Sequence, residues 1–140
     1  MKKIRWGILS TGKIAGSFTE DIKHVSDAEV VAVGSRNQAT ADAFGNKHNI
    51  PNRHSSYRDL ANDPDVDVIY IATPHVFHAA NSILCMEAKK AVLCEKAFSI
   101  HAGEAKTMIQ TARENNTFLM EALTTRHFPV IHQVLDWIVD

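Results

Sequence analysis

Short apolar runs alternate with longer amphipathic segments along most of this chain. The runs predict strands, and the segments between them predict helices because their apolar residues recur every three or four positions. In the first such segment, Ile14, Phe18 and Ile22 fall on one face of a helix. We expect strands at residues 4–9, 29–34, 51–56, 66–72, 91–94 and 117–122. We expect helices at residues 12–25, 38–48, 57–60, 76–88 and 102–115.

This alternation determines the fold class that we expect. Strands separated by helical segments of this length indicate a parallel sheet covered by helices on both faces. The nearly unbroken apolar run at 66–72 agrees, since a strand of such a sheet is buried on both sides. Right-handed crossovers then give an α/β fold with a doubly wound parallel sheet of about six strands, the Rossmann arrangement.

The last segment departs from this rhythm. After Phe128 and Pro129, a predicted helix carries Val130, Ile131, Val134, Leu135, Trp137, Ile138 and Val139. These residues spread over more than one face, which a helix packed on one side does not need. Two interpretations stay open: a helix whose covering partner is missing because the sequence is cut within a longer protein, or a terminal helix that closes an edge of the sheet.

Composition mainly excludes classes of protein. The 140 residues are 45% hydrophobic and 22% charged, with 15 Lys and Arg against 16 Asp and Glu, as in an ordinary globular domain. Balanced charge predicts no nucleic-acid partner, and no apolar run reaches the ~18 residues of a membrane span. Cys85 and Cys94 form no paired motif, so we expect a reducing, cytoplasmic location.

The turn after the first predicted strand reads Ser10-Thr11-Gly12-Lys13-Ile14-Ala15. Against the dinucleotide pattern G-x-G-x-x-G/A, Gly12 and Ala15 fit, and Ser10 stands in place of the first glycine. Gly12 would let the backbone approach a pyrophosphate closely, and the helix that follows would direct its amides at the phosphates. The cofactor-binding residues predicted here are Ser10, Thr11, Gly12, Lys13 and Ile14.

A second phosphate motif overlaps this turn. The stretch from Gly7 to Lys13 satisfies G-x-x-x-x-G-K, the opening of a nucleotide-triphosphate loop. The next residue should be Ser or Thr to bind magnesium, but it is Ile14, and Gly7 lies within the predicted strand. We therefore discount a nucleotide triphosphatase.

The second predicted strand ends in Ser35 and Arg36, where an NAD site usually carries Asp or Glu. A carboxylate would repel a 2′-phosphate, whereas Ser35 could hydrogen-bond it and Arg36 could pair with it. NADP is therefore favoured over NAD as the cofactor. The alternative for Arg36 alone is a solvated residue at the start of a helix.

Three further stretches lie at the carboxyl ends of predicted strands. They are Thr73-Pro74-His75 with His78, Glu95-Lys96, and Met120-Glu121-Ala122 followed by Arg126. Together with residues 10–15, this ordered set resembles the Gfo/Idh/MocA family of NAD(P)-dependent oxidoreductases. Within this family, the sequence most resembles the branch of dimeric dihydrodiol dehydrogenases and NADP-dependent D-xylose dehydrogenases. The stretches that carry this resemblance are residues 5–8, 91–96, 118–122, 126 and 128–129.

The resemblance implies an enzyme of two domains and more than twice this length. Residues 1–124 would form the dinucleotide-binding domain, and residues 125–140 a linker and the first helix of an α+β substrate domain that this chain lacks. That second domain would wall the substrate site and make a homo-oligomer. The implied reaction is hydride transfer between NADP and a hydroxyl carbon of a sugar or diol. The alternative is a stand-alone dinucleotide-binding module without catalysis.

The resemblance also assigns roles to individual residues. Lys96 would lie beside the nicotinamide as the catalytic residue, where partial desolvation would help its amine to accept or relay the hydroxyl proton. The family motif has proline where this chain has Ala97, so the backbone after Lys96 lacks a fixed φ. The residues implied to line the nicotinamide half of the site are Thr73, Pro74, His75, His78, Glu95, Lys96 and Arg126.

The histidines also raise the question of a metal. His75 and His78 are three residues apart, but the other six histidines fall in no spacing compatible with zinc. We predict no metal site. Helix capping or solvation remains an equal alternative for His75, Glu95 could instead make a structural salt bridge, and Arg126 could belong to the domain junction.

Overall fold

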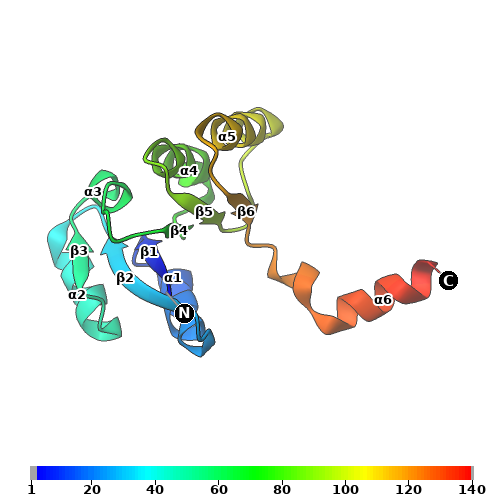
Figure 1. Ribbon diagram of the computed structural model, residues 1–140, viewed down its shortest axis with the longest axis horizontal. Helices are drawn as coiled ribbons and strands as arrows, with labels where there is room; N and C mark the ends of the chain where they lie inside the picture. Colours follow the sequence, from blue (N-terminus) through cyan, green and yellow to red (C-terminus); the bar gives the residue numbers. More distant parts are fainter. Residues whose placement is uncertain (1–2, 140) are drawn as a thin grey trace.

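The computed structural model describes residues 3–139, which form a sheet between two layers of helices (Figure 1). Six strands are paired in parallel in the order β3-β2-β1-β4-β5-β6. Their bounds are β1 Ile4–Leu9, β2 Ala28–Gly34, β3 Asn52–His54, β4 Val68–Ile71, β5 Ala91–Cys94 and β6 Leu119–Glu121. The expected doubly wound Rossmann sheet is confirmed.

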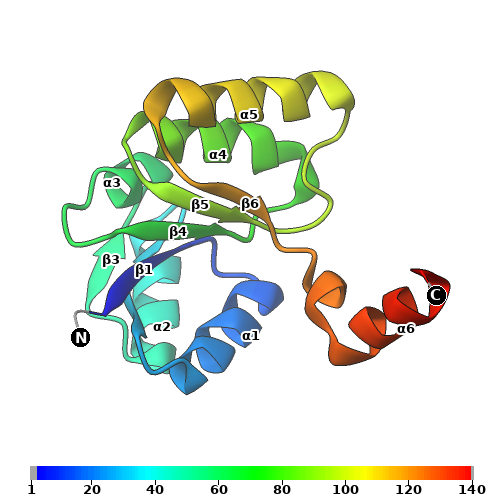
Figure 2. The same cartoon turned by 45° about the vertical axis from the view of Figure 1, so that its right-hand side comes forward.

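Helices α1 (Lys13–Asp21) and α2 (Gln38–His48) cover one face of the sheet, as Figure 2 shows. Helices α3 (Tyr57–Ala61), α4 (His78–Glu87) and α5 (Ala102–Asn115) cover the other. The short 3₁₀ segments are η1 (Ile22–His24), η2 (His75–Phe77) and η3 (Thr124–His127). The connecting helices switch from one face of the sheet to the other between β1 and β4. These two strands lie side by side although β2 and β3 separate them in sequence.

The side chains of each strand point alternately to the two faces of the sheet, so the core consists of two apolar clusters, one on each face. Ile8 packs with Val33 and Phe44 in the cluster beneath α1 and α2. Its neighbour Leu9 packs with Met86 in the cluster beneath α3, α4 and α5. Because successive side chains of a strand point to opposite faces, both must be apolar in a strand covered twice. Cys85 and Cys94 are buried free thiols, as the sequence indicated.

Several predicted boundaries were too wide. The first helix was expected over 12–25, but α1 ends at Asp21, and Ile22–His24 continues as a 3₁₀ turn. The strand expected over 66–72 is shorter because the amide of Val66 donates to the carbonyl of Asp63 and closes a turn. The helix expected from residue 76 begins at His78, after a turn in which the Pro74 carbonyl accepts from the Phe77 amide.

Helix α6 (Pro129–Val139) stands clear of the sheet and its layers in both views (Figures 1 and 2). Its Val130, Trp137 and Ile138 are 63%, 70% and 73% exposed. The interpretation of this segment as a helix closing a sheet edge was therefore wrong. No helix within residues 3–139 is both long and apolar enough to cross a bilayer.

An apolar hollow of about 530 Å³ lies on the α1 side of the sheet. Trp6, Phe18, Tyr70, Leu93 and Met120 are among the residues that line it. The Phe18 and Tyr70 rings stack with their centroids 3.9 Å apart. The carboxylate of Glu95 lines the same hollow, so this charged residue borders a mainly hydrocarbon surface.

Candidate functional site

The predicted site residues gather along one edge of the sheet. Parallel strands end at a common edge, and β1 and β4 are neighbours whose crossovers leave in opposite directions, which opens a crevice there. The loops after β1, β2, β4 and β5 carry nearly all of the predicted residues. Those within these loops or in the first turn of the helix that follows are Ser10, Thr11, Gly12, Lys13, Ile14, Ser35, Arg36, Thr73, Pro74, His75, His78, Glu95 and Lys96. Arg126 lies apart, on η3 beyond β6.

The turn after β1 holds Ser10 at φ 109°, a left-handed conformation that favours glycine. Glycine is the residue that the dinucleotide pattern expects at this place. Gly12, by contrast, has an ordinary φ of −74°. A Cβ added to Gly12 would meet only the Oγ of Ser10, at 3.8 Å. Packing within the described part of the chain therefore gives no reason for glycine at position 12, whereas a group approaching from outside would.

Helix α1 begins directly after Gly12 without a side-chain cap. The side chains of Asn37, Ser56 and His101 accept from backbone amides at the starts of α2, α3 and α5. The first amides of a helix need acceptors and carry the positive end of its dipole. Space above Gly12 and free amides behind it fit the pyrophosphate of a dinucleotide.

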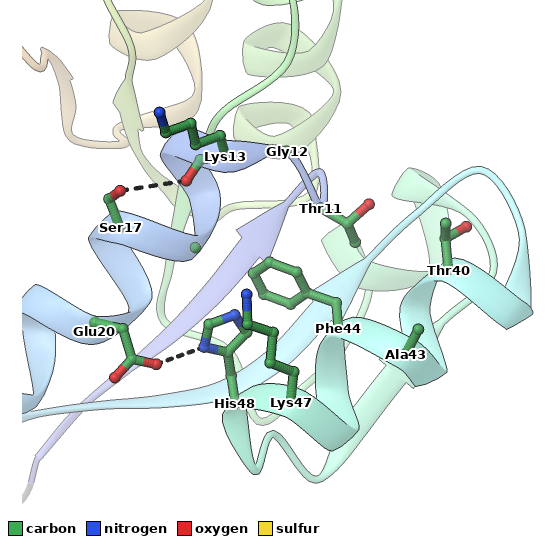
Figure 3. A pocket seen from close by; sticks show the side chains of 11 residues that line it. Thr11, Gly12, Lys13, Ser17, Glu20, Thr40, Ala43, Phe44, Lys47 and His48 are labelled. Carbon is green, nitrogen blue, oxygen red and sulfur yellow. Dashed lines mark hydrogen bonds and ion pairs between the residues drawn. The ribbon is translucent and has the colours of Figure 1, made fainter.

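A groove of about 580 Å³ runs from this turn between α1 and α2 (Figure 3). Thr11 and Lys13 line one end, and Glu20 and His48 lie at the other. His48 Nδ1 is 2.6 Å from Glu20 Oε1, a contact that joins the two helices. Hydrogen bonds from Lys23 and then His48 lower the pKa of Glu20. Lys13 and the amides of the turn lie at the other end of this groove, next to Gly12.

The loop after β2 presents one buried and one exposed polar residue. Ser35 is buried, and its hydroxyl donates to Thr40 Oγ1 at 3.0 Å. Arg36 is exposed, and its guanidinium has no hydrogen bond or ion pair within residues 3–139. Burial raises the pKa of Tyr57, and the charge of Arg36 opposes that shift, so the two side chains lie near each other. The charge of Arg36 is available to an anion.

The loop after β4 separates the two histidines. Pro74 and His75 are exposed, whereas His78 is fully buried. His78 Nε2 lies 2.8 Å from the Thr73 carbonyl oxygen, and Nδ1 lies 2.8 Å from that of Ala97. His78 was expected to line the crevice, but the structure places it beneath the crevice, between two loops. The hydroxyl of Thr73 is likewise turned inward and accepts from Asn81.

Residues 95–98, which we name the Lys96 loop, follow β5. The side chain of Lys96 is exposed, and its ammonium has no partner within residues 3–139. Residues 3–139 alone therefore do not give the Lys96 amine the shielding from solvent that we expected for a catalytic lysine. The Lys96–Ala97 peptide bond is cis.

Glu95 lines the apolar hollow and is hydrogen-bonded within the chain. Its Oε1 accepts a hydrogen bond from the Tyr70 hydroxyl, and its Oε2 accepts from the Lys96 amide at 3.1 Å. Burial, followed by this bond to Glu95, raises the pKa of Tyr70, so the phenol stays a donor. Within residues 3–139 the partners of Glu95 are thus a neutral tyrosine and a backbone amide, and the alternative of a structural salt bridge is not what the structure shows.

Two supporting residues were missed as site residues from the sequence. Tyr70 looks like another member of an apolar strand, and only its hydroxyl, a donor inside a buried run, could have signalled a polar role. Glu121 contributed only to the family resemblance, yet its Oε1 accepts from the Phe98 amide at 2.8 Å. Residues 3–139 contain no cluster of three His, Cys, Asp or Glu side chains able to hold a metal ion.

Comparison with known proteins agrees with this geometry. The sequence model of the Gfo/Idh/MocA family, described as an oxidoreductase family with an NAD-binding Rossmann fold, matches residues 4–123. The chain is similar to trans-1,2-dihydrobenzene-1,2-diol dehydrogenase from Bos taurus, with 45% identity over 130 residues covering 91% of this chain and 39% of the relative. The Homo sapiens protein of that name is 46% identical over 128 residues, covering 90% of this chain and 38% of the relative. The chain thus spans about two fifths of the length of these relatives.

Solved structures give the same picture. KijD10, a 3-ketoreductase from Actinomadura kijaniata solved with TDP-benzene and NADP, superposes with a TM-score of 0.91 at 29% identity, covering 98% of this chain and 43% of that one. The WlbA dehydrogenase from Chromobacterium violaceum, solved with NADH and UDP-GlcNAcA, gives a TM-score of 0.82 at 26% identity, covering 90% and 36%. Both structures were solved with a nicotinamide dinucleotide. The one in KijD10 is NADP, and the one in WlbA is NADH, which lacks the 2′-phosphate.

Proposed function

The chain belongs to the Gfo/Idh/MocA oxidoreductase family, and we propose that it is the NADP-binding part of an enzyme that transfers a hydride between NADP and a hydroxyl carbon of a sugar or diol. The observation that carries this proposal is the turn after β1. A Cβ at Gly12 would occupy space that no described residue fills, in front of an uncapped helix. Such a turn serves a ligand phosphate better than it serves the fold.

The preference for NADP rests on the loop after β2. Arg36 presents an unpaired guanidinium, and neither Ser35 nor Arg36 is the acid that would hold the ribose hydroxyls of NAD. A 2′-phosphate would gain a charge-assisted hydrogen bond from Arg36. The stacking of Arg36 on adenine would be an additional contact.

Titration of the chain with NADPH and NADH tests this preference. We expect NADPH to bind more tightly, and Arg36→Ala to weaken NADPH by about tenfold to 100-fold while leaving NADH nearly unchanged. Arg58→Ala, an exposed arginine on α3, is the matched control and should change neither affinity. Failure of both dinucleotides to bind, or a preference for NADPH that survives Arg36→Ala, would refute the assignment.

Lys96 is the residue to which we assign the proton transfer. When bound, the nicotinamide would accept or donate the hydride. The amine of Lys96 would take the hydroxyl proton as the alcohol is oxidised and return it in reduction. The place of Lys96 at the carboxyl end of β5, with no hydrogen bond or ion pair to its side chain within residues 3–139, supports this role. Pro74 and His75 would line the same half of the crevice, with Arg126 at its outer end.

The test of Lys96 needs an enzyme in which residues 1–140 are joined to the remaining length that the relatives have. Lys96→Met should lower kcat by at least about 100-fold while the Kd for NADPH stays within about twofold, since an aliphatic chain of similar length keeps the packing. Lys106→Met, an exposed lysine on α5, should leave kcat unchanged. Undiminished turnover in Lys96→Met would exclude a catalytic role.

The arrangement beyond this domain is part of the same proposal. Residues 1–124 would form the dinucleotide domain, and 125–140 would begin an α+β domain that completes the substrate site and the oligomer. The exposed apolar residues of α6 support such a continuation. A stand-alone binding module is not favoured, because the similar proteins are named as dehydrogenases and a reductase. A cytoplasmic location stays a prediction.

A further inference from the structure

The backbone that follows Lys96 is held by side chains from two other elements, His78 of α4 and Glu121 of β6. We propose that His78 and Glu121 are positioning residues that clamp the Lys96 loop and so aim the amine of Lys96 into the crevice. This inference rests on the proposed function of Lys96. Neither residue would touch the cofactor or the substrate.

His78 joins the two loops that bound the second half of the crevice. Its imidazole is fully buried at the start of α4, with the Thr73 carbonyl oxygen 2.8 Å from Nε2 and the Ala97 carbonyl oxygen 2.8 Å from Nδ1. A carbonyl oxygen only accepts, so each neutral tautomer donates to one loop and the imidazolium donates to both. One ring therefore contacts both loops, and in every protonation state it donates to at least one of them.

Glu121 holds the same loop from β6. Its Oε1 accepts from the Phe98 amide at 2.8 Å. An ionised acceptor makes such a bond stronger than a neutral one does. His78 contacts the Ala97 carbonyl oxygen, and Glu121 accepts from the Phe98 amide of the same peptide group. Glu95 accepts from the amide of Lys96 itself.

The direction of the Lys96 side chain depends on this backbone. Its exposed ammonium makes no hydrogen bond or ion pair within residues 3–139, so no polar contact there orients the side chain. A lysine side chain is long and has many rotamers, and an error of about 1 Å at a reacting group lowers rates strongly. A fixed loop restricts where the amine can reach.

The first measurement reports the loop itself. Amide hydrogen exchange of Lys96 and Phe98 is followed by NMR in the chain, with the Ile8 amide in β1 as an internal reference for global unfolding. In His78→Leu and in Glu121→Leu, we expect Lys96 and Phe98 to exchange at least about tenfold faster relative to Ile8, as the loss of one hydrogen bond would produce. Glu121→Gln keeps an oxygen acceptor and should restore most of the protection of Phe98. His24→Gln, an exposed histidine on η1, is the control.

The second measurement separates the two ends of the crevice. NADPH and adenosine 2′,5′-bisphosphate, which lacks the nicotinamide half, are titrated into each variant. We expect His78→Leu to weaken NADPH by roughly fivefold while the bisphosphate binds as in the wild type, because only the nicotinamide end has moved. Equal weakening of both ligands would mean a general structural loss and would overturn the proposal.

Unchanged exchange of Lys96 and Phe98 in both leucine variants would overturn the clamp while leaving the proposed function intact. Failure of the wild type to bind either ligand would overturn the proposed function, and the exchange rates would still decide whether the loop is clamped. Should His78→Leu not fold, Glu121→Leu against Glu121→Gln decides the same question through the exchange of Phe98.

Discussion

The two halves of the crevice are built in different ways. In the first half, at the ends of β1 and β2, the turn around Gly12 and the guanidinium of Arg36 face solvent and have few partners in the chain. In the second half, at the ends of β4, β5 and β6, buried His78 and the half-buried Glu95 and Glu121 each contact loop backbone, and Glu95 also accepts from the Tyr70 hydroxyl. The first half is arranged to contact a ligand, and the second half is arranged to hold its own loops.

This difference predicts how substitutions will act. A change in the first half should alter affinity for a ligand and leave the folded state nearly as stable, because little of the chain depends on it. A change in the second half should alter stability or loop order first, and ligand affinity only as a consequence. Four substitutions test this contrast, from the largest expected effect to the smallest.

Gly12→Asp should have the largest effect. Aspartate is among the best N-cap residues, so the melting temperature should stay the same or rise. Its carboxylate would occupy the phosphate position, so the affinity for NADPH should fall by about 100-fold or more. Ser17→Asp adds the same charge to α1 outside the turn and should cost far less affinity. A fall in stability that parallels the fall in affinity would contradict the contrast.

Tyr70→Phe addresses the second half. The ring would keep its stacking on Phe18, but Glu95 would lose a hydrogen-bond donor at the edge of the apolar hollow. We expect the free energy of unfolding to fall by about 1–3 kcal/mol in urea denaturation. Tyr57→Phe removes a hydroxyl that has no hydrogen bond within residues 3–139 and should cost less. Equal losses in the two variants would mean that the bond to Glu95 does not support the fold.

Ser10→Gly should act in the opposite direction. A non-glycine residue at φ 109° costs of order 1–3 kcal/mol, and glycine removes this cost while losing some chain entropy in folding. We therefore expect a gain of about 1 kcal/mol in thermal denaturation. Ser17→Gly, within α1, should instead lose about 0.5 kcal/mol. A loss at both positions would show that the backbone at Ser10 is unstrained.

Asp63 gives the smallest effect and a pH dependence. Burial raises its pKa, but bonds from the Asp65 amide, His54 and Asn52 outweigh this and hold the pKa below 3.8. A carboxyl with a lowered pKa in the folded state stabilises fully above its ordinary value and loses that contribution as the pH falls through the folded value. The stability advantage of the wild type over Asp63→Asn should therefore shrink by a few tenths to about 1 kcal/mol below about pH 4.

This last substitution also sharpens the contrast between the halves. The contacts of Asp63 are with β3 and with the turn before β4, away from the turn at Gly12. The affinity of folded Asp63→Asn for NADPH at pH 7 should thus equal that of the wild type. A weakened affinity would mean that buried contacts away from the crevice also shape the ligand site.

The same contrast explains what the sequence could predict. The strands, the helices, the turn around Gly12 and the position of Arg36 follow from local patterns, and the family resemblance named Lys96. The supports of the second half join residues 19, 23 and 25 positions apart, in the pairs His78–Ala97, Glu121–Phe98 and Tyr70–Glu95. No local pattern encodes such pairs. His78 was consequently expected beside a ligand, although it is buried between loops.

The order of the strands has a consequence for how this fold can diversify. The crevice exists because the chain leaves β1 and β4 toward opposite faces, and no particular side chain is needed to open it. The location of the site is therefore inherited with the path of the backbone. Residues that face a ligand from the first half, such as Arg36, can be exchanged with little loss of folding stability. Cofactor preference can thus change in evolution or by design without loss of the fold. The buried hydrogen bonds of the second half, by contrast, must be kept or replaced together.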